Sequence, residues 1–185
     1  MTKKTMLMVF GALLGAAFFT SCKKDRLKPR DNEGELITTV ELRFTEQGSS
    51  EAKHFFFRDT DGEGGNPPSD HDEIVLDADK TYFCEIFFRN EAVEPAEDIT
   101  EEIEEEGVDH QVYFETDPAT LLAIEILDRD TDGLPLGLQS KWVTTGSGTG
   151  TVIVTLKHKP EQKAANDPVS KGETDVELPF TVKIR

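Results

Sequence analysis

One alternating run of aspartates has the spacing of a calcium-binding loop. Asp128, Asp130 and Asp132 alternate with other residues and lead into Gly133, which reproduces the first half of the D-x-D-x-D-G pattern. Calcium prefers several carboxylate and carbonyl oxygens gathered in a tight turn. The twelfth position is Gln139, whose side chain cannot supply a bidentate carboxylate. The run therefore predicts a turn between two strands that either binds calcium or is a plain tight turn.

A second acidic run lies nearer the amino terminus. Asp59, Asp61 and Glu63 alternate ahead of a pair of glycines. Their oxygens make the run a second, less specific candidate for calcium. Tight turns also favour aspartate and glycine, so a turn without a bound ion fits the same residues.

Two of the four histidines are placed as ligands of a transition metal would be. His110 precedes one strand-like alternation and His158 follows another, each in phase with an apolar face. Strand ends on one rim of a sandwich can converge, and imidazoles with a carboxylate bind zinc or copper. Glu105, Glu106 or Asp109 supplies the acid in this hypothesis. The alternative is two separate histidines, each hydrogen-bonded at the margin of the core.

The stretch that contains these acids is the most unusual part of the chain. It holds nine carboxylates between residues 94 and 109 and no lysine or arginine. Like charges three or four residues apart on a helix repel each other. The stretch is therefore predicted to be a solvated acidic face, a docking surface for a basic partner or a weak divalent-cation site.

The sequence contains none of the common catalytic patterns that we sought. It lacks H-E-x-x-H, G-x-S-x-G and a phosphate-binding loop. Residues 69–72 hold the side-chain types of a hydrolase triad, but neighbours in an extended segment point apart. The sequence therefore predicts a protein that is not an enzyme.

Alternation of apolar and polar residues predicts the elements that position these side chains. It recurs in about nine segments separated by Gly, Asp, Asn and Pro, and one face of each segment is apolar. Antiparallel sheets with one solvated face have this pattern, and two such sheets pack into a sandwich. We therefore predict an all-β fold, an antiparallel immunoglobulin-like β-sandwich over residues 36–185.

Two local features modify this plan. Ile99 and Ile103 recur at helical spacing. Pro95 suits the first turn of a helix and Gly107 suits an exit, so this segment predicts one short acidic helix across the sandwich. Pro179 interrupts the last strand and cannot donate to a ladder, so that strand is predicted to be bulged or at an edge.

The amino terminus has the anatomy of a secretory signal peptide. Two lysines precede an apolar run of about 14 residues, shorter than the roughly 20 that span a membrane, and small residues follow. Residues 1–21 are therefore predicted to be removed. Cys22 and the small residues before it resemble the lipobox of bacterial lipoproteins, so residues 22–35 become a polar, lipidated tether. Lys23 after the cysteine is similar to the sorting signal for the outer membrane.

Charge and cysteine content limit the partners. The formal net charge is −17 at pH 7, and removal of the two signal-peptide lysines makes it −19. Nucleic acid and anionic headgroups repel such a protein, so contact with the membrane is expected through the Cys22 lipid. Cys84 is the one other cysteine in the sequence, and its apolar alternation predicts a buried thiol without a disulfide.

The chain resembles a family of small uncharacterised envelope lipoproteins. Residues 59–65, 95–114 and 135–138 carry the resemblance. Members are loosely labelled as type 1 periplasmic binding proteins, and some are encoded beside TonB-dependent outer-membrane receptors. The resemblance implies an outer-membrane receptor as partner and brings no catalytic residues. The α/β fold that the label implies disagrees with the alternating strands.

Two hypotheses for function follow. The first is a non-enzymatic outer-membrane lipoprotein that binds a ligand or docks on a transporter, for uptake of a metal or metal complex. The second is a calcium-stabilised structural or adhesion module with no transported ligand. Tight binding of a transition metal favours the first, whereas a calcium-dependent melting temperature with no other ligand favours the second.

Overall fold

The computed structural model describes residues 36–62 and 65–185. Four predictions lie outside the described residues: the signal peptide of residues 1–21, the lipid on Cys22, the tether of residues 22–35, and Glu63 as a metal ligand. The described residues all belong to one compact unit, Glu33–Arg185. No helix in the described part of the chain is long and apolar enough to cross a membrane.

Strands dominate the described residues, which confirms the prediction of an all-β fold with one short helix. In chain order the elements are β1 (Thr39–Glu46), β2 (Ala52–Arg58), β3 (Asp70–His71), β4 (Ile74–Leu76), β5 (Thr81–Asn90), β6 (Glu97–Asp98), α1 (Ile99–Glu105), β7 (His110–Asp117), β8 (Leu122–Ile126), β9 (Gln139–Thr144), β10 (Gly148–His158) and β11 (Glu173–Ile184). Nine of these strands overlap the predicted segments. The other two, β3 and β6, contain two residues each, too few for an alternation to show.

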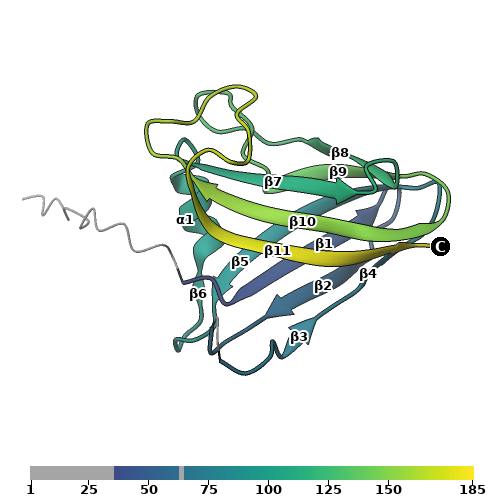
Figure 1. The fold of residues 1–185 in the computed structure, drawn as a ribbon, viewed down its shortest axis with the longest axis horizontal. Coiled ribbons are helices and arrows are strands. Elements are labelled where there is room, and N and C mark those ends of the chain that lie inside the picture. Colours follow the sequence, from purple (N-terminus) through teal and green to yellow (C-terminus); the bar gives the residue numbers. More distant parts are fainter. Residues whose placement is uncertain (1–35, 63–64) are drawn as a thin grey trace, which may run out of the picture. The chain divides into compact units, whose positions relative to one another are not determined.

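The strands form two sheets that stack face to face (Figure 1). The larger sheet has the order β3-β2-β1-β5-β9-β8, with β6 paired to β5, and the smaller has the order β4-β11-β10-β7. The pairing of β4 with β11 is parallel and the other pairings are antiparallel. The predicted antiparallel sheets are therefore present. The immunoglobulin-like part of the prediction concerns connectivity, and this strand order does not establish it.

The core lies between the sheets because alternate residues of each strand face inwards. Trp142 on β9 and Phe44 on β1 lie edge to face, with ring centroids 4.9 Å apart. Phe114 on β7 contacts Trp142 from the smaller sheet at a centroid distance of 5.5 Å. Cys84 is buried in the same core, as the alternation predicted. Burial of these apolar side chains is the main term that favours folding.

Helix α1 begins later than predicted. Its first residue is Ile99, and the carboxylate of Asp98 caps it by accepting the Thr100 N–H at 3.0 Å. The expectation that Pro95 occupies the first turn was wrong. Residues 97–98 instead pair with the end of β5 as strand β6, so the helix starts after that pairing ends.

Pro179 lies on β11, near the edge of the smaller sheet. Strand β4 pairs with Val182, Lys183 and Ile184 and stops short of Pro179. Strand β11 is therefore not an edge strand, since β4 pairs with it, but Pro179 lies outside that pairing and its missing N–H interrupts no hydrogen bond with β4. A register shift in the pairing of β10 with β11, between Leu156 and Lys157, adds a bulge farther along β11.

Candidate functional site

Three segments meet at one end of the sandwich, which we call the α1 end: helix α1, the loop of residues 127–138 and the loop of residues 159–172 (Figure 1). Hydrogen bonds link them. Nζ of Lys163, in the last loop, donates to the Gly107 carbonyl at 2.7 Å and to the Asp130 carboxylate at 2.6 Å. Most residues that the sequence suggested as ligands lie at this end.

The structure brings the two predicted histidines together. His110 opens β7 and His158 closes β10, and the two are direct cross-strand partners. Their imidazole rings are stacked, with centroids 4.8 Å apart and planes inclined by 18°. His110 is 3% exposed, and burial lowers the pKa of its imidazole. Two neighbouring imidazoles, one of them buried and neutral, therefore stand at the α1 end.

The three acids suggested as partners of this pair lie in different surroundings. The Glu105 side chain is exposed on α1. Glu106 is the C-cap residue of α1, and its backbone carbonyl accepts a hydrogen bond from Nδ1 of His110 at 3.1 Å. Asp109 accepts the Glu161 N–H at 3.4 Å. Over residues 36–62 and 65–185, no three His, Cys, Asp or Glu side chains are grouped so that they could hold a metal ion.

The Asp128 run is a turn whose carboxylates accept backbone N–H groups. Asp128 accepts from Gly137 at 2.9 Å and from Leu138 at 2.8 Å, one donor to each oxygen. Oδ1 of Asp130 accepts from Asp132 at 2.9 Å and from Leu134 at 2.8 Å. The Asp132 side chain is exposed. These contacts match the alternative of a plain tight turn, and the calcium version stays a prediction.

A lysine ammonium occupies the position where a cation would neutralise this turn. Lys163 and Asp130 have side chains only 2% and 0% exposed. Burial alone would raise the pKa of Asp130, but hydrogen bonds from Lys163 and Leu134 and the charge of Lys163 lower it overall. Sequence reasoning missed Lys163, which lies in a polar loop with no pattern that marks it for burial.

The Asp59 run is also a turn with internal hydrogen bonds. Asp59 accepts the Gly62 N–H at 3.1 Å. Asp61 accepts both the backbone N–H of Asn66 at 2.9 Å and its side-chain amide at 2.5 Å. The two carboxylates thus stabilise a tight turn, and calcium binding at this run remains an untested prediction.

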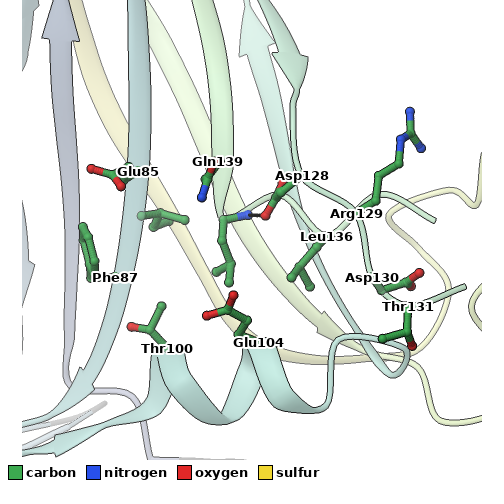
Figure 2. A pocket seen from close by; sticks show the side chains of 12 residues that line it. Glu85, Phe87, Thr100, Glu104, Asp128, Arg129, Asp130, Thr131, Leu136 and Gln139 are labelled. Atoms are coloured by element: carbon green, nitrogen blue, oxygen red, sulfur yellow. Dashed lines mark hydrogen bonds between the residues drawn. The ribbon is translucent and has the colours of Figure 1, made fainter. Parts of the chain in front are cut away.

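A cleft of about 380 Å³ lies between α1, β5 and the loop of residues 127–138 (Figure 2). It forms because β9 pairs with β5 over Thr81 to Glu85, which leaves the rest of β5 beside α1. Glu85 and Phe87 on β5 face Glu104 and Thr100 on α1, and Leu136 stands on the loop side (Figure 2). The cleft therefore combines apolar walls with carboxylates, the chemistry of a site for a small cationic or polar ligand.

The fold and the α1 end together define the class of protein. It is a small acidic β-sandwich whose candidate ligand groups gather at one end of two stacked sheets. The chain matches no family model, no curated protein and no solved structure. The resemblance to envelope lipoproteins therefore stays a prediction.

Proposed function

We propose that this protein is a non-enzymatic, lipid-anchored protein of the outer membrane that binds a ligand or docks as an accessory of a transporter. One observation carries the proposal. The acidic helix, the cleft and the histidine pair, which are separate in sequence, all lie at the α1 end. A protein that holds its polar groups at one end can present them together to a ligand or to a neighbouring protein.

The anchor supports a membrane partner. Multiple acyl chains on Cys22 would hold the protein stably at a membrane, and residues 22–35 would link it to the domain. Tethering raises the effective concentration of the α1 end towards neighbouring membrane proteins. Docking on an outer-membrane receptor then needs a smaller interface than a free protein would need.

The charge of α1 indicates the chemistry of a docking partner. Glu101, Glu104 and Glu105 are exposed, and the last turn of the helix holds no basic residue. Carboxylates at the C-terminus of a helix oppose its dipole, and a basic surface on a partner would relieve this repulsion. We therefore propose that the receptor presents lysine or arginine side chains to α1.

The calcium-stabilised structural module is the weaker candidate. It needs free carboxylate oxygens in the Asp128 run. Both oxygens of Asp128 accept backbone N–H groups, and Lys163 already neutralises Asp130. Calorimetric titration with millimolar calcium tests this candidate directly, and heat of binding that disappears in Asp130→Asn would favour it over docking.

Affinity purification from native membranes tests docking. The full-length protein is expected to retain an outer-membrane receptor, and the triple variant Glu101→Gln/Glu104→Gln/Glu105→Gln is expected to lose it. The matched control removes three other exposed acids away from α1, Glu51, Glu73 and Glu177, with the same change of charge. Equal retention by both variants, or no retained receptor with the native protein, would refute docking through α1.

A further inference from the structure

The larger sheet ends at β8, whose outer edge pairs with no described strand (Figure 1). The Leu127 N–H donates to the Gln139 carbonyl beside β8 at 2.9 Å, so residues in phase with Leu127 bond towards β9. The alternate residues turn their backbone groups the other way. The N–H and C=O groups of Leu122, Ile124 and Ile126 therefore point away from β9, and no hydrogen bond from another described residue reaches them.

The sheet margins at β3, β4 and β7 are shorter or better protected than the margin at β8. Strands β3 and β4 contain two and three residues. Strand β7 carries Glu115 and Asp117, and its Val112 N–H already donates to the Leu136 carbonyl at 2.7 Å. Short length, charged residues and covering loops are the usual means by which proteins prevent edge-to-edge pairing. Strand β8 has five residues with no proline and no lysine, so it is the least protected margin.

The charge around β8 allows a second copy of the chain to approach it. The whole chain has a net charge of −17, so two copies repel each other in general. Glu125 is the one charged residue of β8, and Lys141 on β9 forms an ion pair with it. The other fully exposed residue of β8, Ala123, is uncharged. The edge of β8 is therefore locally neutral in a strongly acidic protein.

We propose that two copies of this chain associate by antiparallel pairing of β8 with β8 across a two-fold axis at Ile124. This register pairs Ile124 with its own copy and Leu122 with Ile126, so all three outward residues exchange hydrogen bonds. It also places Glu125 opposite Ala123. A shift of the pairing in one direction would place Glu125 opposite itself, and like charges directly opposite each other are destabilising. A shift in the other direction leaves Ile126 without a partner on β8.

The same pairing covers apolar surface. Ile124 is half-buried and packs against the core. Residues directly opposite each other in an antiparallel pair lie on the same face of the sheet, so Ile124 would contact Ile124 of the second copy. This contact removes apolar surface from water and extends the core across the axis. Because the interface lies on β8, the inference does not rest on the lipid anchor or on docking through α1.

Sedimentation equilibrium of the full-length chain tests the inference, with Cys22→Ser in every sample so that no lipid contributes to association. We expect a reversible equilibrium between monomer and dimer. Ala123→Glu places a second acid opposite Glu125 of the other copy and should weaken the dimer at least about fivefold, whereas Ala123→Lys should strengthen it. The matched controls are Ala52→Glu and Ala52→Lys, which make the same charge changes at an exposed alanine on β2. They should change the dissociation constant by less than about twofold.

Cysteine cross-linking tests the register. In the proposed dimer, residues 123 and 125 of facing copies form a non-hydrogen-bonded pair with Cα atoms about 4.5 Å apart, within the reach of a disulfide. On mild oxidation, a mixture of the single variants Ala123→Cys and Glu125→Cys should give a cross-linked dimer. Either variant alone should not, because identical residues then lie on a diagonal about 7–8 Å apart.

Circular dichroism verifies that each variant folds. A chain that stays monomeric at millimolar concentration overturns the inference. So does a dimer that responds no more to substitutions at Ala123 than to those at Ala52, or a single cysteine variant that cross-links as well as the mixture.

Discussion

Nζ of Lys163 lies 2.6 Å from Oδ2 of Asp130, and both side chains are almost completely withdrawn from solvent. The same ammonium donates to the Gly107 carbonyl at 2.7 Å. One side chain thus joins the loop of residues 159–172 to the acidic turn and to the end of α1. This relationship explains how a polar loop is held at the α1 end.

Removal of Lys163 should destabilise the protein strongly. Lys163→Met leaves the Asp130 carboxylate buried without its counter-charge, which typically costs about 3–5 kcal/mol. Urea unfolding measures the loss. Lys141→Met is the matched control, because Lys141 and its partner Glu125 are 34% and 62% exposed and should contribute about 1 kcal/mol or less. Equal losses in the two variants would contradict the structural role of Lys163.

Calcium should not stabilise the native protein. The oxygens of Asp128 and Asp130 are occupied by backbone N–H groups and by Lys163. We therefore expect the melting temperature to be the same in chelator and in millimolar calcium. A melting temperature that rises by several degrees in calcium would support the hypothesis of a calcium-stabilised structural module.

Acid should weaken the larger sheet through Glu41. This carboxylate is 3% exposed and contacts His54 at 2.7 Å, Arg89 at 2.8 Å and Arg43 at 3.2 Å. Burial alone would raise the pKa of Glu41, but the hydrogen bonds from His54 and Arg89 and the charge of Arg89 lower it overall. A lowered pKa stabilises the folded state above the unfolded pKa, and this contribution disappears as pH falls through the folded pKa.

Glu41→Gln isolates this contribution. At pH 7 the variant should be less stable by about 1.5–3 kcal/mol, the usual contribution of a hydrogen bond to a charged group. The difference should shrink as pH falls below about 4, the ordinary pKa of a glutamate, because the unfolded carboxyl is protonated there, and it should be lost as pH falls through the lowered pKa of folded Glu41. Melting temperatures of both proteins across pH measure the effect. A difference that is constant down to pH 2 would show that charge is not its cause.

The Cys84 thiol should be unreactive in the folded protein. It is 1% exposed, and burial raises its pKa far above that of a free thiol. With Cys22→Ser as background, iodoacetamide at pH 8 should label Cys84 in urea and not in buffer. Mass spectrometry counts the labels, and rapid labelling of the folded chain would argue that this part of the core opens.

The fold was predictable because its signal is local and repeated. Each strand of a half-solvated sheet alternates apolar and polar residues, so nine strands were visible one at a time. Strands β3 and β6 were not predicted because each contains only two residues, too few to show an alternation of apolar and polar side chains. The start of α1 was predicted too early because residues 97–98 pair with β5 as strand β6 and are not helical. Such pairing depends on a distant segment and cannot be read from the local sequence.

The candidate site was predictable in part. His110 and His158 were visible through their phase with apolar faces, but their contact depends on the pairing of β7 with β10. The acidic turns were recognisable as turns, but the neutralisation of Asp130 by Lys163 depends on a residue from another loop.

The sequence by itself determined the strand pattern, the acidic charge, the buried state of Cys84 and the absence of common catalytic patterns, because these follow from residue type and nearest neighbours. Tertiary structure alone decided which charged groups meet. Lys163 with Asp130, and His110 with His158, come from segments far apart in the chain. Such contacts depend on sheet order and register, which arise from the packing of the whole core.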